Sequence, residues 1–170
     1  MIKTTKLALI AALLAAPCFP QTTENKPEGQ TKYFRLDFTV KELEGGKIVS
    51  ARNYSTSLSN QKGDSSLIRT GDKVPVPTGD KGQFTYLDIG INIDCNALSE
   101  VGSQLAIHIT ADVSGFGPDA PAIAANPPIR QNRWSSTVLV PLRKPTTIFS
   151  SDGASTKRQT QLELTATPIP

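Results

Sequence analysis

Apolar and polar residues alternate along most of this sequence. In the longest example, residues 84–95, the apolar side chains stand two positions apart: Leu87, Ile89, Ile91, Ile93 and Cys95. Successive side chains of a β-strand point to opposite faces of the sheet, so this spacing is typical of a strand with one buried face. The spacing recurs in residues 34–40, 105–113, 134–142 and 160–166. After residue 32 no stretch has the spacing of an amphipathic helix, and the sequence therefore predicts an all-β fold.

Turn signals divide the alternating stretches into about eight strands. Gly45-Gly46 predicts a tight hairpin turn, because glycine accepts a positive φ. Residues 74–77 contain two prolines, which lack the N–H of a sheet ladder, so we expect a sheet edge or an extended connection there. Residues 96–103 are expected to form a short connection with one helical turn, and the Pro-rich residues 115–128 a long surface loop. The expected strands are residues 33–41, 48–58, 67–70, 84–95, 105–113, 134–142, 145–150 and 159–166.

This number and spacing of strands predict a single β-sandwich of about eight mostly antiparallel strands. A small closed β-barrel is the alternative, because it uses the same kind of strands and turns. Residues 33–170 are long enough to form one domain with its own core. Within it, residues 84–95 and 105–113 are expected to pair as a hairpin.

The first twenty residues have the pattern of an export signal. Lys3 and Lys6 precede an apolar run, residues 7–16, that is too short to span a bilayer. Cys18 follows this run, as the modified cysteine of a lipoprotein does, but Pro17 stands where Gly or Ala is usual, so the pattern disfavours a lipid anchor at Cys18. We therefore expect residues 1–20 to be a signal peptide, residues 21–32 a disordered linker, and the mature protein to be periplasmic or secreted.

The charge and the cysteines exclude several classes of protein. Removing Lys3 and Lys6 lowers the formal net charge from +3 to +1, which gives no electrostatic reason to expect nucleic acid as a partner. After signal cleavage Cys95 is the one cysteine left, so no intrachain disulfide is expected. Cys95 ends an apolar stripe and is expected to be a small buried side chain rather than a reactive thiol. No apolar run that could span a membrane follows the signal.

The polar face of the expected hairpin carries the candidate metal ligands. If the hairpin pairs symmetrically, Asn92 lies opposite His108 and Asp88 lies opposite Asp112. Carboxylate and amide oxygens suit Ca²⁺, so this face is a candidate cation site, and a solvated outer face is the alternative. The candidate ligands are Asp88, Asn92, Asp94, His108 and Asp112.

A second candidate surface combines arginines with the single tryptophan. Arg130 and Arg133 precede Trp134, and Arg143 follows the same expected strand. Arginine and tryptophan are enriched at interface hot spots, so this region is a candidate partner-binding surface. The alternative is that the cations protect strand ends from aggregation and that Trp134 lies in the core.

The C-terminal residues resemble a known family. The run RWSSTVLV at 133–140, the apolar TIF at 147–149, the basic pair Lys157-Arg158 and the final strand ending in Thr167-Pro168 are similar to the end of secretin outer-membrane channels. Secretins have a Gly-Gly pair after the second of these strands, where this sequence has Ser150-Ser151. The resemblance covers residues 133–169 and implies a cell-envelope setting.

These observations favour an exported, non-enzymatic β-domain that binds a partner or has a structural role in the envelope. The sequence has no nucleophile elbow, zinc-protease motif, paired Cys-x-x-Cys or P-loop, so neither an enzyme nor a cofactor is expected. The expected partner is another envelope protein, and the oligomeric state is open. Two alternatives remain: a sandwich-type module that binds carbohydrate or Ca²⁺, and a secretin-like component of a secretion assembly.

Overall fold

The computed structural model describes residues 30–78, 83–116, 128–153 and 157–170. The expected signal peptide, the linker up to residue 29 and residues 117–127 of the expected loop lie outside the described residues. Residues 31–170 form one compact unit. Its eight strands are β1 (Tyr33–Glu44), β2 (Lys47–Ser59), β3 (Ser65–Pro77), β4 (Phe84–Val101), β5 (Gln104–Phe116), β6 (Ile129–Pro141), β7 (Thr146–Asp152) and β8 (Arg158–Ile169).

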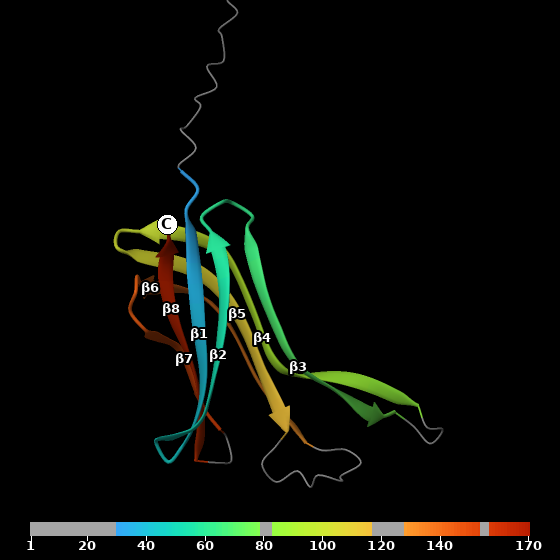
Figure 1. The fold of residues 1–170 in the computed structure, drawn as a ribbon. Helices are drawn as coiled ribbons and strands as arrows, with labels where there is room; N and C mark the ends of the chain where they lie inside the picture. Colours follow the sequence, from blue (N-terminus) through green and yellow to red (C-terminus); the bar gives the residue numbers. More distant parts are fainter. Residues whose placement is uncertain (1–29, 79–82, 117–127, 154–156) are drawn as a thin grey trace, which may run out of the picture. The chain divides into compact units, whose positions relative to one another are not determined.

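The strands form two four-stranded sheets, which confirms the predicted all-β sandwich. One sheet has the order β2-β1-β8-β7 and the other the order β3-β4-β5-β6, and every neighbouring pair is antiparallel. Figure 1 shows the two layers, with β2 and β3 on one side of the sandwich and β6 and β7 on the other. No helix in the described ranges is long and apolar enough to cross a membrane.

The core lies between the sheets and consists of the apolar side chains of the alternating stretches. Phe34, Leu36 and Phe38 of β1 are almost fully buried, as are Ile107 and Ile109 of β5. Each fully buried side chain of this size contributes about 1.5–3 kcal/mol to folding. Partly buried residues complete the core, with Trp134 of β6 packed on Phe149 of β7 at a ring-centroid distance of 5.7 Å. Both sheets supply buried side chains, so the apolar face of each sheet is covered by the other sheet.

The β1–β2 hairpin confirms the predicted glycine turn. Gly45 and Gly46 have φ values of 57° and 82°, which side chains with a Cβ seldom adopt. A register shift between Glu42 and Leu43 lies next to the turn. Beyond this shift the pairing is regular to Tyr33↔Ser59.

The β4–β5 hairpin corrects two predictions. Residues 96–101 continue β4 as a strand, with a register shift between Asn96 and Ser99, so the expected helical turn is wrong. The turn itself is tight and lies at Gly102 and Ser103, where Gly102 has a φ of 61°. This turn moves the register: Asn92 pairs with Asp112 and Asn96 pairs with His108. The symmetric hairpin that set Asn92 opposite His108 and Asp88 opposite Asp112 is therefore wrong.

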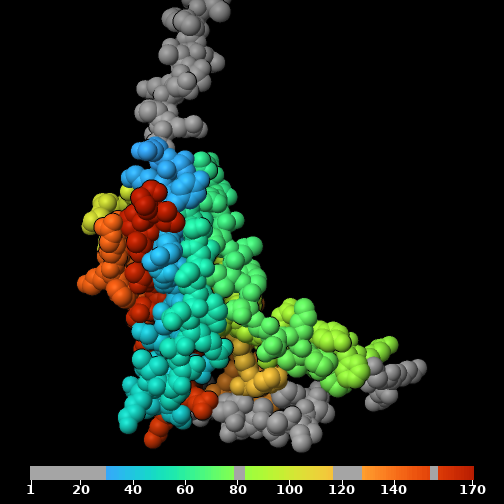
Figure 2. Space-filling view, in the orientation of Figure 1, coloured from blue at the N-terminus to red at the C-terminus, as the bar shows by residue number. Residues whose placement is uncertain are grey.

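A bend at two facing glycines separates part of β3 and β4 from the sandwich. Gly71 pairs with Gly90, and a Cβ on either residue would collide with backbone atoms of the other strand. Residues 84–90 of β4 have no partner in β5, because the β4–β5 pairing stops at Ile91↔Val113. The Ser114 hydroxyl accepts the Gly90 N–H at this point, at 3.0 Å. Residues 71–77 and 84–90 therefore form a two-stranded ribbon, here called the β3–β4 ribbon, which Figure 2 shows in green and yellow-green beyond β2.

Candidate functional site

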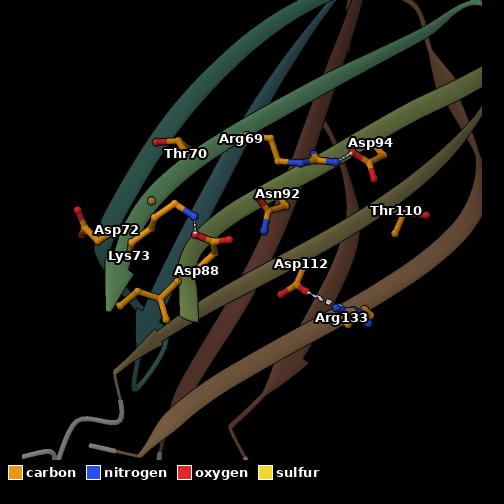
Figure 3. Close-up of a pocket in the computed structure, with 12 residues that line it drawn as sticks. Arg69, Thr70, Asp72, Lys73, Asp88, Asn92, Asp94, Thr110, Asp112 and Arg133 are labelled. Carbon is orange, nitrogen blue, oxygen red and sulfur yellow. Dashed lines mark hydrogen bonds and ion pairs between the residues drawn. The ribbon is translucent and has the colours of Figure 1, made fainter. Parts of the chain in front are cut away.

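The outer face of the β3-β4-β5-β6 sheet contains a polar hollow beside the glycine bend. Its volume is about 660 Å³, within the usual range of ligand sites. Figure 3 shows its side chains, which come from β3, β4, β5 and β6. The polar hollow is lined by Arg69, Thr70, Gly71, Asp72, Lys73, Asp88, Ile89, Asn92, Asp94, Thr110, Asp112 and Arg133.

Three ion pairs run across neighbouring strands of the hollow. Lys73 Nζ lies 2.8 Å from Asp88 Oδ1, and Arg69 Nη2 lies 2.5 Å from Asp94 Oδ1. Arg133 donates from Nε and Nη2 to Asp112 Oδ2, at 3.2 and 2.9 Å. Exposed ion pairs contribute little to stability, so their main effect is to neutralise the carboxylates of this face.

Two carboxylate oxygens in the hollow are buried without a hydrogen bond. Asp112 Oδ2 accepts from Arg133 and from the Gln131 amide at 2.6 Å, whereas Asp112 Oδ1 has no donor. Asp94 Oδ1 contacts Arg69 as an ion but lacks the alignment of a hydrogen bond. Asn92 lies between them, since it pairs with Asp112 and precedes Asp94 by two positions on the same face. A buried acceptor without a donor costs about 1–3 kcal/mol, and Asp112 Oδ1 is such an atom.

The structure brings four of the five candidate metal ligands to the hollow and separates the fifth. Asp88, Asn92, Asp94 and Asp112 line it, whereas His108 lies further along β5 and contacts Thr137 and Ser135 of β6. No group of three His, Cys, Asp or Glu residues within the described ranges is arranged to hold a metal ion. Each of the three carboxylates already faces a cation. The sequence pattern did not reveal these ion pairs, because they join strands whose register was unknown. The calcium site stays a prediction.

The arginines and the tryptophan of the predicted binding surface do not lie on one face, because successive side chains of β6 point to opposite sides of the sheet. Trp134 faces the core and packs on Phe149, while the neighbouring Arg133 faces the polar hollow. Arg130 lines a second cavity of about 420 Å³ between the ends of the two sheets, together with Arg158 and Asp152. Arg143 lies in the turn after β6, with a φ of 59°, and donates its backbone N–H to Ala166 O at 2.8 Å. The four residues therefore do not form one patch, and their role in partner binding stays a prediction.

Each sheet ends in two strands that have no further neighbour within the described part of the chain. These edge strands are β2 and β7 in one sheet and β3 and β6 in the other. The two edges on one side of the sandwich are close to each other, since the hydroxyls of Thr56 in β2 and Ser66 in β3 are hydrogen-bonded. Figure 2 shows β2 and β3 side by side, in cyan and green. Exposed edge strands carry unpaired N–H and C=O groups that can pair with another chain.

Comparison with known proteins gives a fold relationship without sequence similarity. No protein-family model matches this sequence, and no curated protein matches it significantly. Among solved structures, the InvG secretin of the Salmonella SPI-1 type III secretion injectisome matches 82% of this chain with 8% identity and a TM-score of 0.51. The fold is secretin-like. The InvG secretin domain β-barrel gives a TM-score of 0.50 at 7% identity over the same share of this chain.

The secretin resemblance expected from residues 133–169 is thus confirmed at the level of the fold and extends over most of the chain. The match spans 64% of the InvG chain, which is less than two thirds of its length. The type II secretin XcpQ of Pseudomonas aeruginosa matches with a TM-score of 0.46 at 13% identity.

Proposed function

We propose that this protein is a non-enzymatic structural component of the cell envelope, exported and assembled from copies of itself edge to edge. The proposal rests on the directions in which the edge strands of the two sheets run. Each sheet has four antiparallel strands, so its two edge strands run in opposite directions. A second copy placed beside the first then meets β7 with its β2, and β6 with its β3, as antiparallel pairs. Both sheets continue across the same contact.

Such a contact joins two different surfaces and repeats from copy to copy. Contacts of this kind close into rings when the rotation between copies allows it. The secretin-like fold supports the proposal, because InvG is a basal body protein of the injectisome, alongside PrgH and PrgK. Another envelope protein is the expected partner of the assembled form. The export pattern of residues 1–20 supports a periplasmic or secreted location.

The prolines of β3 show which of its N–H groups can be removed without disturbing the pairing with β4. Pro75 and Pro77 have no N–H, yet the β3–β4 register is regular from Ser65 to Pro77. Odd-numbered residues of β3 therefore direct their N–H away from β4, and Thr78, an even-numbered residue, donates its N–H across to Gln83 O at 2.9 Å. Leu67 is odd-numbered, so Leu67→Pro removes one edge N–H and leaves the β3–β4 ladder intact.

We expect the wild-type protein, extracted from envelopes in mild detergent, to be a large oligomer by size exclusion with light scattering. Leu67→Ala is the matched control, because it removes the same exposed side chain but keeps the N–H. The proposal predicts that Leu67→Ala assembles and that Leu67→Pro stays folded but fails to form the large species. A monomeric wild type, or equal assembly of the two variants, would contradict it.

A further inference from the structure

The polar hollow and the β3–β4 ribbon share one face of β4. Alternation along β4 places Phe84, Tyr86 and Asp88 on the same side as Asn92 and Asp94. Tyr86 is 64% exposed and Phe84 57% exposed, although aromatic rings of this size are usually covered. Pro75 and Pro77 of β3 pair with them, so this side of the ribbon is an apolar platform next to a polar cavity.

The charges of the hollow favour a neutral ligand. Three cations face four carboxylates there: Arg69, Lys73 and Arg133 against Asp72, Asp88, Asp94 and Asp112. Three of the carboxylates are already paired. A free cation would meet the three basic side chains, and an anion would meet the carboxylates. Neither kind of ion finds an excess of opposite charge large enough to bind it.

The hydrogen-bonding groups of the hollow favour a ligand with many hydroxyls. The carboxylates of Asp94 and Asp112 are acceptors, the guanidinium groups of Arg69 and Arg133 are donors, and the Asn92 amide supplies both kinds of group. A hydroxyl donates one hydrogen bond and accepts others, so adjacent hydroxyls can satisfy both sets. The Asn92 side chain has no hydrogen bond to any other residue that the structure describes, which leaves its amide open to a ligand.

We propose that this face binds a neutral oligosaccharide. One or two sugar units fill the hollow, with hydroxyls donating to Asp94 and Asp112 and accepting from Arg69 and Arg133. The next unit lies on the platform, where the apolar face of the ring stacks on Tyr86. The hollow and the platform together specify a neutral glycan chain rather than an ion, and the inference does not depend on edge-to-edge assembly.

Isothermal titration of the full chain with maltohexaose, cellohexaose and chitohexaose tests the inference. Binding of at least one of these sugars is expected, with affinity reduced at least tenfold by Asn92→Ala and by Tyr86→Ala. Tyr33→Ala is the matched control, since Tyr33 is a similarly exposed tyrosine on β1 of the other sheet, and its affinity should equal that of the wild type.

The same titration can overturn the inference. No heat with any of the three sugars at millimolar concentration, or unchanged affinity in both Asn92→Ala and Tyr86→Ala, would mean that water alone fills the hollow. Thermal melting of each variant identifies a loss of folding. Tyr86 is exposed on the ribbon, so Tyr86→Ala is expected to keep the wild-type melting temperature even if Asn92→Ala does not.

Discussion

Asp64 organises the connection between the two sheets through one side chain. Its Oδ2 accepts hydrogen bonds from the backbone N–H and the hydroxyl of the buried Ser59, at 2.7 and 2.6 Å, and its Oδ1 accepts the Ser65 N–H at 2.9 Å. These bonds, above all the one from the Ser59 hydroxyl, hold the pKa of Asp64 below the ordinary value of 3.8. A lowered pKa stabilises the native state above the unfolded-state pKa, and this stabilisation is lost as the pH falls through the native-state pKa.

We therefore expect Asp64→Asn to lower the free energy of unfolding at pH 7 by about 1 kcal/mol, a usual net value for a hydrogen bond. The difference from the wild type should disappear as the pH falls below 3.8. Urea melts between neutral and acidic pH measure this gap. Asp72→Asn, at an exposed aspartate in β3, is the control. A gap that stays constant with pH would show that the charge of Asp64 contributes nothing.

Cys95 gives a second prediction at the residue scale. It is 1% exposed, and burial, with a smaller effect of the neighbouring Asp94, raises the pKa of its thiol to about 12. The thiolate is the nucleophile, so native protein should react with a maleimide only when it unfolds. Mass spectrometry after labelling, with and without urea, checks this result. Rapid labelling of Cys95 in native protein would contradict the buried position.

At the scale of elements, the glycine bend decides where the β3–β4 ribbon leaves the sandwich. Gly90 has a φ of 146°, and a Cβ there would collide with backbone atoms of Thr70 and Gly71. Gly90→Ala is expected to cost more than about 2 kcal/mol, since backbone strain and a backbone clash add. Gly115→Ala is the matched control, because a Cβ on Gly115 meets no atom and its φ is not positive. Equal melting temperatures of the two variants would rule out a structural role for the bend.

The same elements show which features could be predicted from the sequence. Alternation indicated the strands and their buried faces, because a period of two follows directly from strand geometry. Register could not be predicted, because the tight turn at Gly102 and the irregularity after Asn96 set it, and neither changes the alternation. The register determines which side chains meet in the polar hollow. Arg69 and Lys73 also line it, and they belong to β3, a strand that is longer than the expected residues 67–70. Asp88, Asp94 and Asp112 were therefore predicted to share this face, whereas Asp72, Arg69 and Lys73 were not, and Arg133 was assigned to a different surface.

At the scale of the whole domain, the two sheets should unfold as one unit because they share a core. Ile107 of β5 is fully buried between them. Ile107→Ala is expected to lower the free energy of unfolding by roughly 2–5 kcal/mol. Leu139→Ala, at an exposed position of the neighbouring β6, should change it by less than about 0.5 kcal/mol. The fluorescence of Trp134 and the circular dichroism of the sheets should follow one transition, and two separate transitions would contradict a shared core.

Cross-linking between copies shows whether β2 of one copy lies against β7 of the next. Cys95 is buried, and we expect Cys18 to be removed with the signal or blocked by lipid. New cysteines can therefore be introduced at Ala51 of β2 and Ser150 of β7, which are both exposed and stand at the same level of the sheet through Lys41 and Gln161. With a bis-maleimide, edge-to-edge assembly predicts a ladder of covalent oligomers from the double variant and from neither single variant. Dimers from a single variant, or no ladder from the double variant, would contradict this assembly.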